Sequence, residues 1–173
     1  MNETRTQLQP AVLLFLISVF IFLAFGCGTG GGNDHRSVLV FSKTAGFRHA
    51  SIEDGKEMFL QLAGEKGFKV DTTEDASVFT EQNLSKYNLV VFLSTTGDIL
   101  NEEQQIELQR FMQAGGNWMG IHAAADTEYK WPWYNQLCGA WFLSHPKHQE
   151  ATILVDYRTH PSTKHLNETL TRF

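Results

Sequence analysis

The fold of this chain is constrained most by its short apolar, β-branched runs, which are separated by stretches with helical periodicity. Residues 37–41 (Ser-Val-Leu-Val-Phe) and 88–93 (Asn-Leu-Val-Val-Phe-Leu) are nearly continuous in apolar character, which is typical of strands covered on both faces. Residues 68–73 alternate as an outer strand does, and 117–121 and 151–155 are further candidate strands. Because strands alternating with helices form parallel βαβ units, we predict an α/β fold with a doubly wound, mostly parallel sheet and 37–41 at its centre.

The helices between these runs have recognisable ends. Ser51, with Asp54 three residues later, is typical of a helix N-cap, and Gly67 is placed to end that helix. Residues 80–87 fit a helical turn or two. Residues 101–115 open with Asn-Glu-Glu-Gln, a capping box, and give the strongest helix signal in the chain.

The N-terminus indicates export. Residues 11–25 carry no charge and are too short for a typical membrane span of about 20 residues, so we interpret 1–26 as a signal peptide. Leu-Ala-Phe-Gly-Cys, ending at Cys27, resembles a bacterial lipobox, and 27–36 follow as a glycine-rich tether. We therefore predict a lipoprotein anchored at Cys27 in the bacterial cell envelope, in the periplasm or at the outer membrane. An uncleaved anchor and an ordinary signal peptide are the alternatives.

Charge and cysteine content limit the remaining possibilities. The formal net charge is −5, which gives no reason to expect nucleic-acid binding. With Cys27 lipidated, Cys138 is the sole remaining cysteine, so no internal disulfide is expected. Residues 37–173 suffice for one domain, and the oligomeric state stays open.

Ligands of open parallel sheets bind beyond the carboxyl ends of the strands. The loop after residue 41 contains Lys43, Arg48 and His49, donors that run into a helix N-terminus. A solvated basic loop is the alternative interpretation.

The segment around His122 resembles a nucleophile elbow, in which a strand turns sharply into a helix and lifts one side chain. Gly120, Ala123 and Ala124 are small, as this arrangement requires. Histidine at the raised position is suited to proton transfer, metal ligation or hydrogen bonding rather than to acyl transfer. A structural histidine is the alternative.

Several well-spaced motifs carry a family resemblance. They are Phe-Ser-Lys-Thr-Ala-Gly-Phe-Arg-His at 41–49, Gly-Ile-His-Ala-Ala-Ala-Asp-Thr at 120–127, Trp-Pro-Trp-Tyr at 131–134, Leu-Cys-Gly-Ala at 137–140, and the His-Pro pairs at 145–146 and 160–161. With these motifs the chain resembles the trehalose-utilisation (ThuA-like) family over residues 37–173. The resemblance implies a flavodoxin-like, three-layer α/β/α fold similar to class I glutamine amidotransferases, and a role in sugar metabolism.

The chain differs in two ways from the proteins it resembles. His122 stands where amidotransferases carry the nucleophilic cysteine, so glutamine amidotransferase activity is not expected. The later segment of the family is missing after residue 173, so we expect a domain that is incomplete at its C-terminus.

The other histidines and the aromatic residues allow more than one role. His145 and His148, with His160 and Asp126, make a divalent metal such as zinc conceivable, but their spacing is no known ligand pattern. We therefore predict no metal or other cofactor and favour hydrogen bonding to a sugar. Trp131 and its aromatic neighbours Trp133, Tyr134 and Trp141 either stack on a sugar or belong to the core or a lid.

The resulting hypothesis is an envelope domain that binds or transforms a carbohydrate of the trehalose or keto-sugar class. His122, His49 and Asp126 are the candidate catalytic residues, and Lys43, Arg48, Trp131 and His145 are the candidate substrate contacts. Whether the chain is an enzyme, of hydrolase or isomerase type, stays open. The alternatives are a non-catalytic sugar- or partner-binding module of a larger envelope protein and a structural remnant.

Overall fold

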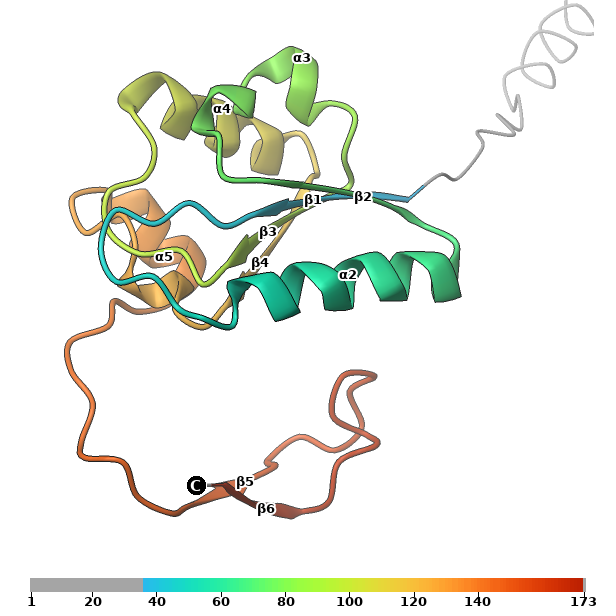
Figure 1. The fold of residues 1–173 in the computed structure, drawn as a ribbon, viewed down its shortest axis with the longest axis vertical. Helices are drawn as coiled ribbons and strands as arrows, with labels where there is room; N and C mark the ends of the chain where they lie inside the picture. The colour runs from blue at the N-terminus through green and yellow to red at the C-terminus, as the bar shows by residue number, and fades with distance from the viewer. Residues whose placement is uncertain (1–35, 173) are drawn as a thin grey trace, which may run out of the picture. The chain divides into compact units, whose positions relative to one another are not determined.

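A parallel sheet of four strands organises the residues that the computed structural model describes, 36–172 (Figure 1). The strand order is β2-β1-β3-β4, and the strands are β1 (Ser37–Phe41), β2 (Lys69–Thr73), β3 (Leu89–Leu93) and β4 (Asn117–Ile121). Each neighbouring pair is parallel. β1 and β3, the two continuously apolar runs, are the inner strands and are buried, which confirms the predicted parallel α/β sheet.

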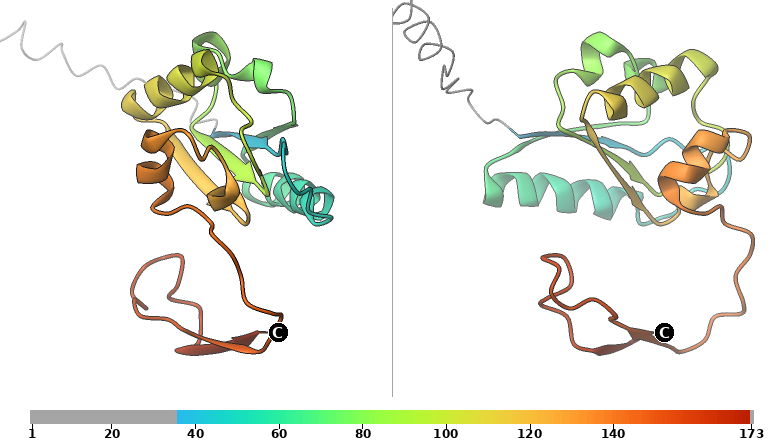
Figure 2. Two further views of the ribbon diagram at one scale, coloured as in Figure 1. Left: turned by 90° about the vertical axis from the view of Figure 1, so that its left-hand side faces the viewer. Right: turned by 180° about the vertical axis from the view of Figure 1, so that it is seen from behind.

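Helices cover both faces of this sheet, giving three layers (Figure 2). α2 (Ile52–Lys66) lies on one face, and α3 (Glu81–Leu84), α4 (Glu102–Gln113) and α5 (Pro132–Cys138) lie on the other. Alternate residues of the inner strands enter two separate cores. The core on the α2 side contains Val38, Val40, Phe59, Val91 and Leu93. The larger core on the opposite side includes Leu39, Phe41, Val90, Phe92, Leu108 and Tyr134.

The helix ends agree with the sequence in two of three cases. Asn101 and Gln104 form the predicted capping box of α4, each side chain accepting a backbone N–H from the other residue. Gly67 ends α2 with a left-handed φ of 72°. Ser51 makes no side-chain capping bond because its own backbone is already helical, whereas an N-cap needs an extended backbone. The side-chain cap expected at Ser51 was therefore wrong.

The region after β4 departs from the expected elbow. A short 3₁₀ turn, Ala124–Asp126, follows the strand, and α5 begins only at Pro132. His122 thus precedes a tight turn rather than a helix.

The last predicted strand also pairs differently from expectation. β5 (Ala151–Leu154) pairs antiparallel with β6 (Thr169–Arg172) in a sheet of its own. Between α5 and β5 the chain forms no helix, and a parallel pairing needs a crossover, usually a helix. The expected parallel placement of residues 151–155 was therefore wrong.

The predicted signal peptide 1–26, the lipidation site Cys27 and nearly all of the 27–36 tether lie outside the described residues. Within residues 36–172, none of the helices has the length and apolar composition needed to cross a bilayer.

Candidate functional site

Three loops meet at the carboxyl end of the sheet and are tied together by hydrogen bonds. The Ala45 amide donates to the Thr96 carbonyl at 2.7 Å, and the Thr96 hydroxyl donates to the Phe47 carbonyl at 2.8 Å. The Ser94 hydroxyl donates to the His122 carbonyl, also at 2.8 Å. The loop after β3 therefore joins the loops after β1 and β4, at the edge where parallel sheets bind ligands.

His49 and His122 lie side by side at this edge. Their ring centroids are 4.9 Å apart and the rings meet edge to face. His49 comes from the loop after β1, whereas His122 follows β4 directly and is exposed. Two residues earlier, a Cβ on Gly120 would stand 2.5 Å from the Trp118 ring and 3.0 Å from Ala124 Cβ. The small residue expected before His122 is thus required by space.

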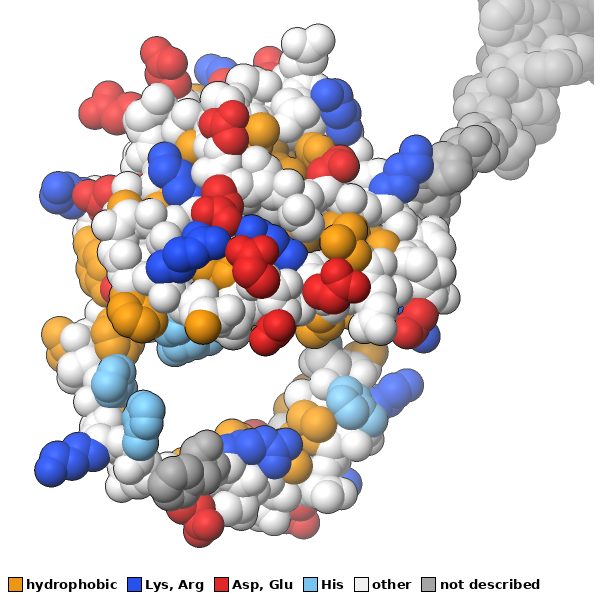
Figure 3. Space-filling view, viewed as in Figure 1, with side chains coloured by type: hydrophobic (Ala, Val, Ile, Leu, Met, Phe, Trp, Pro, Cys, Tyr) orange, Lys and Arg blue, Asp and Glu red, His pale blue; other side chains and the backbone are white. Residues whose placement is uncertain are grey.

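A pocket of about 780 Å³ opens in front of this histidine pair. It contains four of the predicted site residues, His49, His122, Asp126 and His145. The other lining residues are Phe47, Ala123, Phe142, Pro146, Lys147, His148, Gln149 and Ala151. Figure 3 shows histidine side chains around this hollow. Its size and its mixture of apolar surface with a few polar groups are typical of small-molecule sites.

Asp126 is held by a residue that the sequence did not single out. The Tyr129 hydroxyl makes a short hydrogen bond to the Asp126 carboxylate and lies 2.9 Å from the Phe142 carbonyl. Burial, followed by the bond to Asp126 and the charge of that carboxylate, raises the pKa of Tyr129 to about 12. The phenol consequently stays protonated near neutral pH and orients the carboxylate. The only sequence signal for this contact is that Tyr129 lies three residues after Asp126.

The two predicted basic contacts, Lys43 and Arg48, do not line the pocket. The Lys43 ammonium donates to the Ile99 carbonyl at 3.0 Å. Arg48 binds Glu74 at 2.7 Å and Glu53 at 3.0 Å. Both cations therefore make contacts within the domain, and the pocket's lysine is Lys147, a residue outside the predicted set.

The aromatic run near Trp131 packs largely against the protein. Trp131 stacks on Trp133 with centroids 4.9 Å apart and also contacts the core that contains Tyr134. The structure thus places Trp131 with the core residues and not on the pocket wall. Trp141 stacks on Tyr129, next to the Asp126 carboxylate.

Glu128 anchors the loop after β3 and was also missed by sequence reasoning. Its side chain is buried and accepts the amides of Ile99 and Leu100 at 2.8 and 2.7 Å. A third bond comes from the Gln105 side chain at 2.7 Å. Burial raises the pKa of Glu128, with the three bonds opposing that shift. This carboxylate holds the turn that precedes α4, a structural role that no local pattern indicates.

Metal ligation is not prearranged at this site. Across the described part of the chain, no three histidine, cysteine, aspartate or glutamate side chains are arranged to hold a metal ion. The absence of a resident cofactor stays a prediction.

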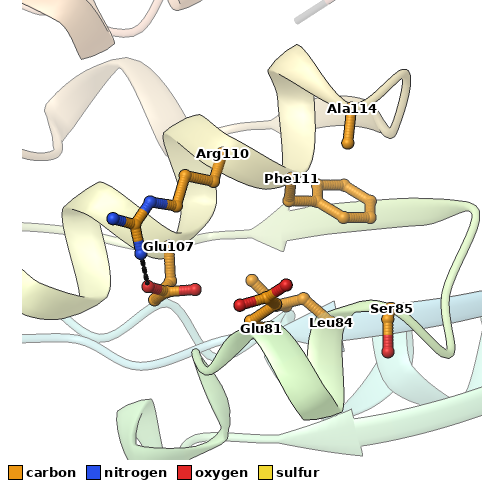
Figure 4. Close-up of a pocket in the computed structure, with 7 residues that line it drawn as sticks. All are labelled: Glu81, Leu84, Ser85, Glu107, Arg110, Phe111 and Ala114. Carbon is orange, nitrogen blue, oxygen red and sulfur yellow. Dashed lines mark hydrogen bonds and ion pairs between the residues drawn. The ribbon is translucent and has the colours of Figure 1, made fainter.

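A second hollow, of about 350 Å³, lies between α3 and α4. Figure 4 shows Glu107 beside Arg110, a pair joined at 2.7 Å, together with Leu84 and Phe111. This second hollow contains none of the predicted site residues, so the pocket at the sheet edge is the better candidate for a functional site.

The layers define an α/β domain of the flavodoxin-like type, with its candidate pocket at the carboxyl ends of parallel strands. The family profile for ThuA, trehalose utilisation, matches residues 37–173. This chain therefore belongs to the ThuA family. No curated protein has a matching sequence.

Two crystal structures are similar to this chain. A ThuA-like protein from Bacteroides uniformis is 26% identical, with a TM-score of 0.68 over 79% of this chain and 58% of its own length. A ThuA-like protein from Parabacteroides merdae is 21% identical, with a TM-score of 0.64 over 79% of this chain and 60% of its own. The chain thus spans about three fifths of each neighbour's length.

Proposed function

We propose that the pocket at the carboxyl edge of the sheet binds a carbohydrate during sugar utilisation. The observation that carries this proposal is that His49, His122 and Asp126 line one pocket although they come from two separate loops. Sugars present many hydroxyl groups, and imidazole and carboxylate side chains both donate to and accept from hydroxyls according to their protonation state. The family match to trehalose utilisation supports the same substrate class.

The geometry also suits proton transfer on the bound sugar. Histidine exchanges protons near neutral pH, and the His49 and His122 rings are adjacent. Asp126, oriented by Tyr129, supplies an acceptor on the same pocket wall. Cys138, the single free cysteine of the described residues, does not line the pocket. We therefore assign acid–base chemistry of hydrolase or isomerase type to His122, with His49 and Asp126 as its partners.

We further propose that the domain acts at the bacterial cell envelope, held there by a lipid on Cys27. The apolar residues 11–25 and the following Leu-Ala-Phe-Gly-Cys support this location.

Saccharide titration of the full chain tests the proposal. Trehalose, glucose and a keto-sugar are titrated calorimetrically into the wild type, His122→Ala and His165→Ala, and the mixtures are assayed for product by NMR. His165 is exposed and does not line the pocket, so it is the matched control. We expect at least one sugar to bind, with affinity reduced about tenfold or more in His122→Ala and unchanged in His165→Ala.

A His122→Gln variant then separates an enzyme from a binding module. The proposed chemistry requires product from the wild type and none from His122→Gln, because glutamine forms hydrogen bonds but does not exchange the proton. Binding without product in the wild type would instead identify a non-catalytic sugar-binding module. If no sugar binds to the folded wild type, the proposal is wrong.

A further inference from the structure

The ionisable side chains of the pocket are mostly basic. Four histidines and Lys147 line it, against a single carboxylate, Asp126. Three of the basic groups, His145, Lys147 and His148, belong to one exposed segment, 145–149.

These basic groups are not neutralised by neighbouring acids. Within residues 36–172, neither Lys147 nor any of the pocket histidines forms an ion pair with a carboxylate. Outside the pocket, by contrast, Arg48 and Lys56 are both paired with Glu53 and Glu74. The pocket therefore keeps the Lys147 ammonium and the histidine rings available as hydrogen-bond donors to a ligand, and an anion forms the stronger, charge-assisted hydrogen bonds with an ammonium group.

The single carboxylate of the pocket is already engaged. Asp126 accepts the Tyr129 hydroxyl, so part of its hydrogen-bonding capacity is used within the protein. The apolar surface of Phe47, Phe142 and Pro146 completes the wall, which suits the carbon face of a sugar ring more than a bare anion.

We infer that the pocket takes an anionic saccharide, a sugar bearing a carboxylate or a phosphate, whose acidic group is received by residues 145–149. This inference rests on the proposed sugar-binding function and narrows its substrate class. Lys147 and the neighbouring histidines make charge-assisted hydrogen bonds to the anion, and the His49 and His122 pair faces the sugar hydroxyls.

Calorimetric titration of the full chain with glucuronate, glucose 6-phosphate and glucose tests the inference. We expect glucuronate or glucose 6-phosphate to bind at least about tenfold more tightly than glucose. The preferred anion distinguishes a carboxylate from a phosphate ligand.

A pair of matched double variants locates the effect. Lys147→Gln with His148→Gln removes two basic groups of the pocket, and Lys164→Gln with His165→Gln removes the same two residue types at an exposed place elsewhere. We expect the first variant to weaken binding of the acidic sugar about tenfold more than it weakens binding of glucose, and the second to affect neither. Equal affinity for glucose and both acidic sugars, or equal losses in the two variants, would overturn the inference and leave the proposed sugar-binding function standing. If neither these saccharides nor trehalose binds, the inference and the proposed sugar-binding function are both wrong.

Discussion

At the scale of single residues, the tertiary partners decide what each charged side chain does. Arg48 has the residue type and the loop position of a substrate contact, yet it binds Glu74 and Glu53, and Lys56 binds the same two carboxylates. Glu74 lies just after β2 and Arg48 lies in the loop after β1. Because β1 and β2 are neighbouring parallel strands, their ends bring these residues together, which the sequence alone does not indicate.

Replacing Glu74 tests this network. Hydrogen bonds from Arg48 and then Lys56 lower the pKa of Glu74 from 4.5 to about 2, so its stabilising effect is complete above about pH 4.5 and is lost as the pH falls towards 2. Its side chain is 39% exposed, so we expect Glu74→Gln to lower the free energy of unfolding by only about 1 kcal/mol at pH 7.

Urea unfolding at pH 7 and near pH 3 measures the effect. The difference between Glu74→Gln and the wild type shrinks at the lower pH, because near pH 3 the Glu74 carboxylate is mostly protonated in the unfolded chain, where its pKa is near 4.5, but not in the folded protein. Glu107→Gln, in the separate pair with Arg110, is the matched control and shows the smaller loss at pH 7. An equal loss at both pH values would contradict the ionic role of Glu74.

At the scale of elements, local sequence patterns determine where helices begin and end more reliably than what they contact. The α4 capping box and the Gly67 terminus of α2 both follow from residues within one turn of the helix end. The three predictions at this scale that were wrong, the Ser51 cap, a helix directly after His122 and the parallel placement of residues 151–155, depended on backbone geometry and strand partners beyond that range.

Two glycines near the end of α2 provide an internal comparison. A methyl group at Gly64 or at Gly67 meets no atom within 4 Å. Both sites therefore have room for a side chain, and they differ only in backbone conformation. Gly64 is helical, and Gly64→Ala is expected to stabilise by about 0.5–1 kcal/mol. Gly67 has a φ of 72°, so Gly67→Ala is expected to destabilise by about 1 kcal/mol. Thermal and urea unfolding of both variants check the opposite signs, and two changes of the same sign would contradict this account of the helix end.

At the scale of the whole molecule, the proposed lipid on Cys27 predicts where the protein resides in a bacterial cell. The wild type is expected in the membrane fraction, with a diacylglyceryl group on the N-terminal cysteine that intact-mass spectrometry detects. Cys27→Ala removes the thiol that takes the lipid, so the diacylglyceryl group and the processed N-terminus are both expected to be absent. Cys138→Ala keeps the lipobox and is the matched control. An unmodified Cys27 in the wild type would show that the anchor proposal is wrong.

The four parallel strands and the principal helices could be predicted from the sequence, because apolar runs, alternation and capping residues act over a few positions, and the spaced motifs indicated the family. It also predicted that His49, His122 and Asp126 belong to one site, since the loops after the strands of a parallel sheet lie along one edge. Only the tertiary structure decided which side chains complete that site. Lys147 lines the pocket and Tyr129 holds Asp126, whereas Arg48 forms ion pairs with Glu53 and Glu74. These contacts join residues distant in sequence or depend on how a loop folds.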